Sequence, residues 1–305
     1  LDPTDPASFT QVPIGPVSLP LGPQLEGKNN DAYGVRVRWV PDFMNGGNIG
    51  FYVRKFDEIL IWQALTAPSA TQPFGSIRLV YPRGTELYGI SAAREFGGIS
   101  FSAETTYSPN RGLNSNPAPA SDPDGQGARG AVWTGLFNGI YLGKEVLLFG
   151  HSLWDQWIVT AEANASYLDK IDSNEALFKG VDSPGCVGVR WGCSDRSSYG
   201  ADIQIVTSWF QVWTGIDLGA ELFYHRGIHG TSAAIAGGYE GDASGKVALT
   251  IDYQRLFQAA LAYNYFRTPT QEGRNSDGEK IVTSFSGLGV LDDRDWVSLT
   301  VKYSF

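Results

Sequence analysis

The sequence lacks any long uninterrupted apolar segment. None of its 305 residues belongs to a stretch approaching the roughly 18 to 20 apolar residues that a transmembrane helix needs. The first residues also lack the basic, apolar and small-residue pattern of a secretion signal. These absences argue against helical membrane spans. A processed or trimmed product would lack both features, and so would a soluble protein.

Clustered basic charge is also missing. The chain has 23 Lys and Arg against 32 Asp and Glu, a formal net charge of -9, and no basic cluster that could bind phosphates. We therefore expect no nucleic-acid partner. A single methionine stands against 37 glycines, 9 tryptophans and 14 tyrosines, a composition that favours strands and turns over helices.

Cysteine is scarce. The only two, Cys186 and Cys193, lie in a Gly-rich stretch with turn character, which in an oxidising compartment predicts one local disulfide. A two-cysteine metal site is the rival interpretation, but no second Cys or His pair at zinc-like spacing follows. We predict the disulfide, and expect no metal and no cofactor.

The C-terminal residues alternate strictly between apolar and polar side chains. In residues 296–305 the odd positions are apolar or aromatic and the even ones mostly polar, which is the period of a half-buried strand. The segment ends on Phe305, like the insertion signal of outer-membrane barrels. We predict that Val297, Leu299, Val301 and Tyr303 face lipid, and that Ser298, Thr300 and Lys302 face the opposite side.

The same alternation recurs along the chain, each time over about the ten residues that a tilted membrane strand needs. The predicted strands are residues 32–40, 48–56, 86–95, 99–107, 130–142, 154–168, 198–209, 216–226, 246–253, 256–266 and 294–305. Eleven antiparallel strands predict an all-β transmembrane barrel, or part of one, over residues 31–305.

Aromatic placement indicates which face meets lipid. Tyr and Trp at the ends of otherwise aliphatic faces, such as Trp157 with Tyr167, match the two interfacial girdles of a lipid-facing band. The opposite faces carry too many charges for a dry core and are predicted to line a wet lumen. The lumen-facing candidates are Arg36, Arg38, Arg54, Glu104, Glu162, Asp217, Glu221 and Asp252.

Connection lengths alternate too. Short links are expected near 41–47, 96–98, 210–215 and 254–255, with a longer one at 143–153; long polar loops are expected at about 57–84, 108–129, 170–197, 227–245 and 267–293. Transmembrane barrels have short periplasmic turns and long outer loops. A globular domain would rarely keep so many long loops without structure. Residues 1–30, with six prolines, are predicted to be a loop or linker.

An odd strand count has a topological consequence. Single-chain bacterial barrels have even strand numbers and both ends in the periplasm, whereas this count places residue 32 outside if Phe305 lies in the periplasm. Since an open edge in lipid costs several kcal/mol per unpaired backbone group, we predict that the chain does not close a barrel alone. Another chain or precursor segment would complete it.

Several short motifs resemble one family of bacterial outer-membrane proteins, domain of unknown function 1302. They are Asp31 to Trp39, Glu86 to Ser91, Tyr107 to Asn110 and Asp293 to Phe305. The chain resembles the C-terminal half of that family, whose members are typically about twice as long. The resemblance implies a channel or export component for hydrophobic compounds such as sterols, alkanes or aromatic esters. The Cys186 to Cys193 loop departs from the pattern.

Catalytic chemistry has little support in the sequence. His151 and Ser152 lie in a predicted turn without a carboxylate partner, so a hydrolytic pair is not favoured. His225 and His229, four residues apart, would share a face only on a helix, and a metal site there is also not favoured. The glycosylation-like triplet at Asn164 lies on a predicted lumen face and is dismissed. We expect no enzyme activity.

Three classes of function follow from this sequence. The first is passage of small molecules through a Gram-negative, porin-like barrel of the outer membrane, in contact with lipid and lipopolysaccharide; the lumen charges of both signs would make a field across the pore. The second is an anchor or scaffold for envelope proteins, with a plugged lumen. The third, a barrel enzyme, would require turnover that His151→Ala abolishes.

Overall fold

The structure is a computed structural model that describes residues 11–14, 17–22, 32–69, 73–122, 124–148, 151–184, 186, 188–235, 237–274, 278, 280–283 and 291–304. These residues form strands, turns and three short 3₁₀ turns. Within them, no helix has the length and apolarity required to cross a bilayer. The predicted all-β class is confirmed.

Eleven strands form one large antiparallel sheet. They are β3 (Tyr33–Trp39), β4 (Asn48–Phe56), β7 (Thr85–Phe96), β8 (Ile99–Gly112), β9 (Arg129–Gly143), β12 (Gln156–Ser173), β13 (Ser197–Trp213), β14 (Ile216–His229), β15 (Ala243–Tyr253), β16 (Phe257–Arg267) and β19 (Trp296–Tyr303). Each strand pairs with the next one in this order, which leaves β3 and β19 at the two edges. All eleven predicted strands are confirmed, and no ladder joins β3 to β19 within the described residues.

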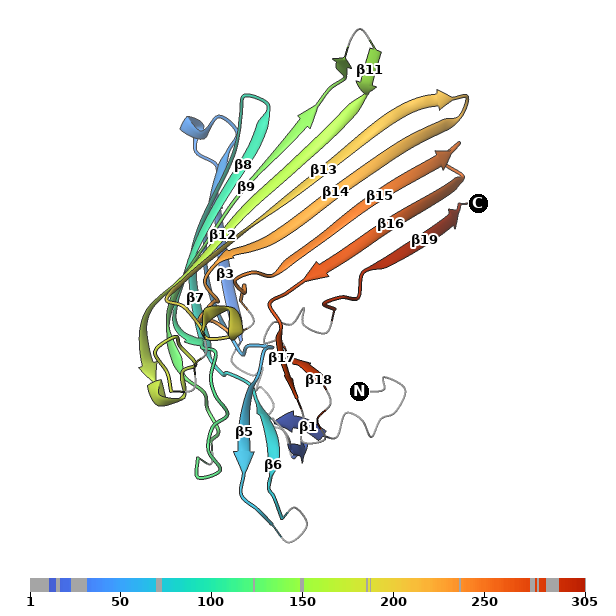
Figure 1. Ribbon diagram of the computed structural model, residues 1–305. Helices are drawn as coiled ribbons and strands as arrows, with labels where there is room; N and C mark the ends of the chain where they lie inside the picture. Colours follow the sequence, from blue (N-terminus) through green and yellow to red (C-terminus); the bar gives the residue numbers. More distant parts are fainter. Residues whose placement is uncertain are drawn as a thin grey trace.

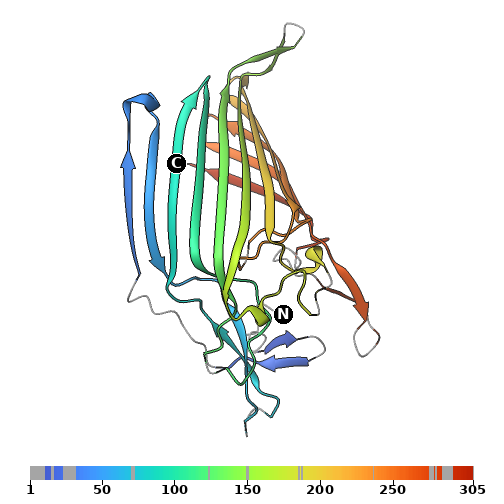
Figure 2. The ribbon, with the colours of Figure 1, turned by 90° about the vertical axis from the view of Figure 1, so that its left-hand side faces the viewer.

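The sheet curls into a deep trough (Figures 1 and 2). Its connections are unequal at the two ends, as predicted: residues 97–98 and 254–256 are short turns at one end, which also carries the longer link at 144–155, whereas the other long connections gather at the opposite end. Gly97 and Gly98 both have positive φ, 60° and 81°. Two such residues make the tight turn whose twist matches that of paired strands.

The segments outside the large sheet are more ordered than the sequence suggested. The structure adds four two-stranded hairpins, β1 (Gln11–Ile14) with β2 (Val17–Pro20), β5 (Trp62–Thr66) with β6 (Ser76–Val80), β10 (Val146–Leu148) with β11 (His151–Trp154), and β17 (Gln271–Arg274) with β18 (Lys280–Thr283). It also adds the 3₁₀ turns η3 (Asp42–Met44), η4 (Glu175–Leu177) and η5 (Val189–Trp191). The expectation of long loops without structure was wrong for those that hold β5 and β6, β17 and β18, η4 and η5, because segments this short show no sustained alternation.

Several strands also run further toward the long-loop end than predicted. β12 continues to Ser173 and β8 to Gly112. The ladder shifts register between Leu168 and Lys170 of β12, and between Ser108 and Arg111 of β8. Such bulges break the period of two while hydrogen bonding continues, so the sequence pattern ends before the strand does.

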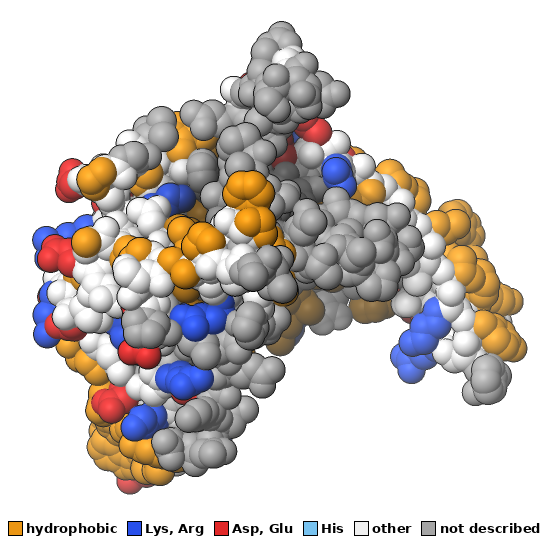
Figure 3. Space-filling view, turned by 90° about the horizontal axis from the view of Figure 1, so that it is seen from below, with side chains coloured by type: hydrophobic (Ala, Val, Ile, Leu, Met, Phe, Trp, Pro, Cys, Tyr) orange, Lys and Arg blue, Asp and Glu red, His pale blue; other side chains and the backbone are white. Residues whose placement is uncertain are grey.

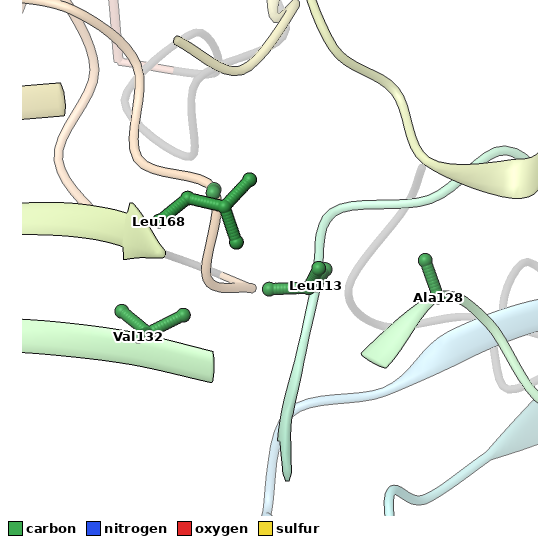
Figure 4. Close-up of a cluster of buried hydrophobic side chains, with 5 residues drawn as sticks. Leu113, Ala128, Val132 and Leu168 are labelled. Atoms are coloured by element: carbon green, nitrogen blue, oxygen red, sulfur yellow. The ribbon is translucent and has the colours of Figure 1, made fainter. Parts of the chain in front are cut away.

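Two small apolar cores lie at the long-loop end. One contains Leu113, Ala128, Val132 and Leu168 together with Ala233 (Figure 4). The other contains Trp62, Ala64, Val80 and Ala118. Apolar burial is the main stabilising term for such segments, so the connections pack on one another and on the strand ends.

Buried Glu58 adds a polar anchor beside these cores. Its carboxylate accepts hydrogen bonds from the Thr85 hydroxyl at 2.8 Å and the Gly112 amide at 2.9 Å. The Arg111 guanidinium lies 3.3 Å away. Glu58 thereby ties the connection after β4 to the ends of β7 and β8, since a buried carboxylate must be paired and hydrogen-bonded.

Candidate functional site

The ladder register gives the sheet one continuous apolar face. Directly paired residues share a face, and the pairs run from Val37 with Phe51 at one edge to Leu261 with Leu299 at the other. Val297, Leu299, Val301 and Tyr303 of β19 lie on this apolar face and are exposed, with Leu299 at 69%. Their predicted exposure is confirmed; Ser298, Thr300 and Lys302 alternate with them on the other face.

Two aromatic rows border the apolar face. The row at the long-loop end contains Tyr33, Tyr88, Tyr107, Trp133, Tyr167, Tyr199, Tyr224 and Tyr265. The row at the short-turn end contains Trp39, Phe96, Tyr141, Trp157, Trp209, Tyr253, Phe257 and Tyr303. Some rings touch within each row: the centroids of Tyr107 and Trp133 lie 4.7 Å apart, and those of Tyr141 and Trp157 lie 5.1 Å apart. The residues between the rows are mostly aliphatic, with Phe51, Phe101 and Phe137 among them.

The opposite, polar face carries all eight candidate residues. The register places Arg36, Arg38, Arg54, Glu104, Glu162, Asp217, Glu221 and Asp252 together on it. Basic residues lie on β3 and β4 at one side of the trough, and acidic ones on β12, β14 and β15 at the other. Among these eight candidates the two signs lie on different sides of the trough, with Glu104 on β8 between them. Lys246 on β15 and Lys302 on β19 add positive charge to the acidic side.

Several acidic candidates have specific partners. Glu221 accepts hydrogen bonds from Lys246 at 2.7 Å and Gln204 at 2.9 Å. Asp217 accepts one from the Gln211 amide at 2.7 Å, and Asp252 one from the Arg255 amide at 2.8 Å. Asp217 and Asp252 thus stabilise short turns, a role that the sequence did not indicate.

The histidines separate from one another in the structure. His225 lies on the polar face with Nδ1 at 2.5 Å from Asp202, which is opposite Glu162. His229 is on the apolar face, where its ring lies 5.1 Å from that of Tyr199. The side chains of His151 and Ser152 lie outside the described residues. In the described part of the chain, no group of three or more His, Cys, Asp or Glu residues could hold a metal ion.

The connection from β14 to β15 folds inward over the polar face. We call residues 230–235 and 237–242 the inward loop. The Ser232 hydroxyl lies 3.4 Å from that of Ser166 in β12, although β13 separates the two strands. Farther on, the carbonyl of Ala233 accepts a 2.7 Å hydrogen bond from the Asn114 amide, and Ala234 forms a bridge with Leu113. The loop therefore reaches the segment that follows β8.

The predicted disulfide is confirmed and adjoins this loop. Cys186 and Cys193 are bonded, with sulfurs 2.03 Å apart. Within the segment that they bracket, the Val189 carbonyl accepts a 2.8 Å hydrogen bond from the Thr231 hydroxyl. Just beyond it, the Ser194 hydroxyl donates to the Ser232 carbonyl at 3.0 Å. The disulfide segment, residues 186 and 188–194, thus packs against the start of the inward loop.

An ion pair joins the same two segments. Arg190 Nε lies 3.1 Å from Glu240 Oε1, and Glu240 Oε2 accepts a 2.9 Å hydrogen bond from the Gly230 amide. That amide hydrogen bond, together with Arg190, lowers the pKa of Glu240. Viewed from this end, charged side chains of both signs are interspersed over the described surface (Figure 3).

The sequence did not reveal the inward loop or the residues that hold it. Thr231, Ser232 and Ala233 are buried, yet they lie in a small-residue segment without periodicity. Only the uncharged, Gly- and Ala-rich segment from 230 to 238 departs from the charged composition of an outer loop. Small residues of this kind permit close packing on another backbone.

The fold and this surface define an all-β protein built on one large antiparallel sheet with an apolar and a polar face. The family described as "Protein of unknown function (DUF1302)" has a model that matches residues 5–305. The chain therefore belongs to this family, and the resemblance seen in its motifs is confirmed across essentially its whole length. No curated protein and no solved structure matches it.

Proposed function

We propose that this chain forms most of the wall of a bacterial outer-membrane barrel that passes small molecules. The observation that carries the proposal is the pair of aromatic rows that border the apolar face. A lipid-facing barrel surface has an apolar band about 25 Å tall between two aromatic girdles, whereas a water-soluble barrel would turn its apolar face inward. Outer-membrane lipid and lipopolysaccharide would cover this band.

Further strands would complete the barrel. Eleven consecutive antiparallel strands leave β3 and β19 running in the same direction, so their direct closure would require a parallel pair. A meander that pairs antiparallel with both edges supplies an odd number of strands, and the total is then even, as in bacterial single-chain barrels. Another chain or another segment of the precursor would provide them.

The polar face would form the pore wall. The arginines on β3 and β4 and the carboxylates on β12, β14 and β15, which Lys246 and Lys302 partly offset, would create a field across the lumen that influences which solutes pass. The family resemblance implies hydrophobic compounds as the transported class. The proposal includes no catalytic step.

Conductance tests the proposal. The complex extracted from membranes is expected to give stable single-channel steps in planar bilayers. A triple variant, Arg36→Gln with Arg38→Gln and Arg54→Gln, should raise the permeability of cations relative to anions, measured as a shift in reversal potential. Lys55→Gln is the matched control, because Lys55 lies in β4 but pairs with Tyr33 on the apolar face.

A structural anchor or scaffold is the second candidate. The inward loop covers part of the polar face, and a barrel whose lumen is closed in this way could hold other envelope proteins without conducting. Absence of channel steps, together with tightly co-purifying envelope proteins, would favour the scaffold and contradict the pore.

A further inference from the structure

A cavity lies between the polar face and the inward loop. Its volume is about 410 Å³, and its lining residues come from β7, β8, β9, β12 and β13, from the connection after β4 and from the loop itself. This volume falls within the range of small-molecule sites, which are concave and combine apolar walls with a few polar groups. The cavity is distinct from the charged sides of the trough.

The polar wall of the cavity consists mainly of hydroxyl groups. It contains Thr106, Thr134, Ser166, Ser198 and Ser232. A hydroxyl can donate or accept and rotates to suit its partner, so this wall can bind a hydroxyl or carbonyl group of a ligand. It holds no fixed array of cations that would select a phosphate or a carboxylate.

The other lining side chains are largely aliphatic. The apolar wall of the cavity contains Leu60, Leu87, Leu136 and Ile235. Of the two charged residues that line the cavity, Arg111 is paired with Glu58 at 3.3 Å. Glu104, which lies opposite Leu136 in the ladder, would repel an anion. The lining therefore suits an uncharged molecule with an apolar body.

We infer that this cavity is a binding subsite for a small neutral amphipathic molecule, one that has an apolar skeleton and bears one or two hydroxyl or carbonyl groups. The apolar body lies against Leu60, Leu87 and Ile235, and the polar group meets the serine and threonine hydroxyls. The inference deepens the proposed function, on which it rests, because it places a binding step under the inward loop on the path of the solute.

Photolabelling with 4-(hydroxymethyl)benzophenone tests the inference. This neutral aromatic ketone with one hydroxyl has the expected chemistry and bonds covalently to adjacent C–H groups on irradiation. In the complex extracted from membranes, peptide mass spectrometry should locate adducts on β8, β9, β12 and the inward loop. Asn164→Phe, which fills the cavity from β12, should lower their yield at least about fivefold.

Two further variants keep the result interpretable. Ala163→Phe, one residue earlier on the exposed apolar face, should leave the yield in the cavity unchanged. Leu136→Trp fills the cavity from β9 and should repeat the effect of Asn164→Phe should that variant fail to fold. Unchanged labelling in a folded cavity-filling variant, or wild-type adducts confined to the apolar face, would overturn the inference.

Channel recordings on the same preparation separate the two proposals. Cavity adducts in a complex that never conducts would support the subsite and contradict the pore. Stable channels without cavity adducts would support the pore and contradict the subsite.

Discussion

The hydroxyl oxygens of Ser166 and Ser232 lie 3.4 Å apart. Ser166 is on the polar face of β12, whereas Ser232 follows β14, and β13 lies between these strands. The contact requires the connection after β14 to turn back over the sheet. A loop in this position narrows whatever space the polar face encloses.

Shortening the inward loop should therefore widen the pore. Replacement of residues 231–241 by a short Gly-Ser linker is expected to raise the unit conductance at least about twofold, because pore diameter limits passage. Single-channel recording in planar bilayers measures the effect. Shortening only the tip of the β5 and β6 hairpin, which projects beyond the sheet (Figure 1), and keeping its core residues Trp62, Ala64 and Val80, should leave conductance unchanged. An equal increase there would contradict the prediction.

The disulfide should hold the start of the inward loop in place. In the double variant Cys186→Ala with Cys193→Ala, we expect the disulfide segment to open more easily, by about 2 to 3 kcal/mol for so short a cross-linked loop. Hydrogen exchange of the Asp195 amide, which donates to the Thr231 carbonyl at 2.8 Å, should accelerate. Exchange in the centre of β15 is the internal control, and equal acceleration there would indicate general destabilisation instead.

The sequence predicted the large sheet well because most of its strands show alternation over most of their length. Both faces of β19 and of β16 could be assigned residue by residue. The same alternation placed Arg36 and Glu162 on one face, since register follows from the apolar pattern when one face is buried or lipid-facing.

The sequence could not predict the arrangement at the long-loop end. The position of Ser232 depends on contacts with Ser166 and with the segments around Leu113 and Val189, which are remote in sequence. The turn roles of Asp217 and Asp252 depend on hydrogen bonds that a strand pattern does not encode. Strand ends beyond Leu168 were missed because bulges remove the period.

Acidification should loosen the inward loop through Glu240. Its pKa is lowered in the folded chain by the Gly230 amide and Arg190, so its charged form stabilises the loop above the ordinary glutamate pKa of about 4.3. The stabilisation of the loop by the charged Glu240 carboxylate is lost as pH falls through this lowered pKa. Open-channel noise should therefore rise below about pH 4.

Glu240→Gln should remove that part of the pH dependence and raise the noise already at neutral pH. Glu175→Gln, at an exposed glutamate of the connection between β12 and β13, is the matched control and should keep the wild-type pH profile. A Glu240→Gln channel with the wild-type profile would show that another group controls the acid response.

The two sheet edges should remain apart in the assembled protein. The double variant Val37→Cys with Leu299→Cys places one thiol in β3 and one in β19, and we expect no cross-link between them on oxidation because other strands lie between. Val37→Cys with Phe51→Cys, a directly paired position in β4, is the positive control and should cross-link. The native cysteines are bonded to each other and do not compete with the introduced thiols.

The intact mass of the complex extracted from membranes should exceed the 33.1 kDa of this chain, since the edge strands need partners. An efficient cross-link between residues 37 and 299 in a complex with only the mass of this chain would show that eleven strands close through a parallel pair.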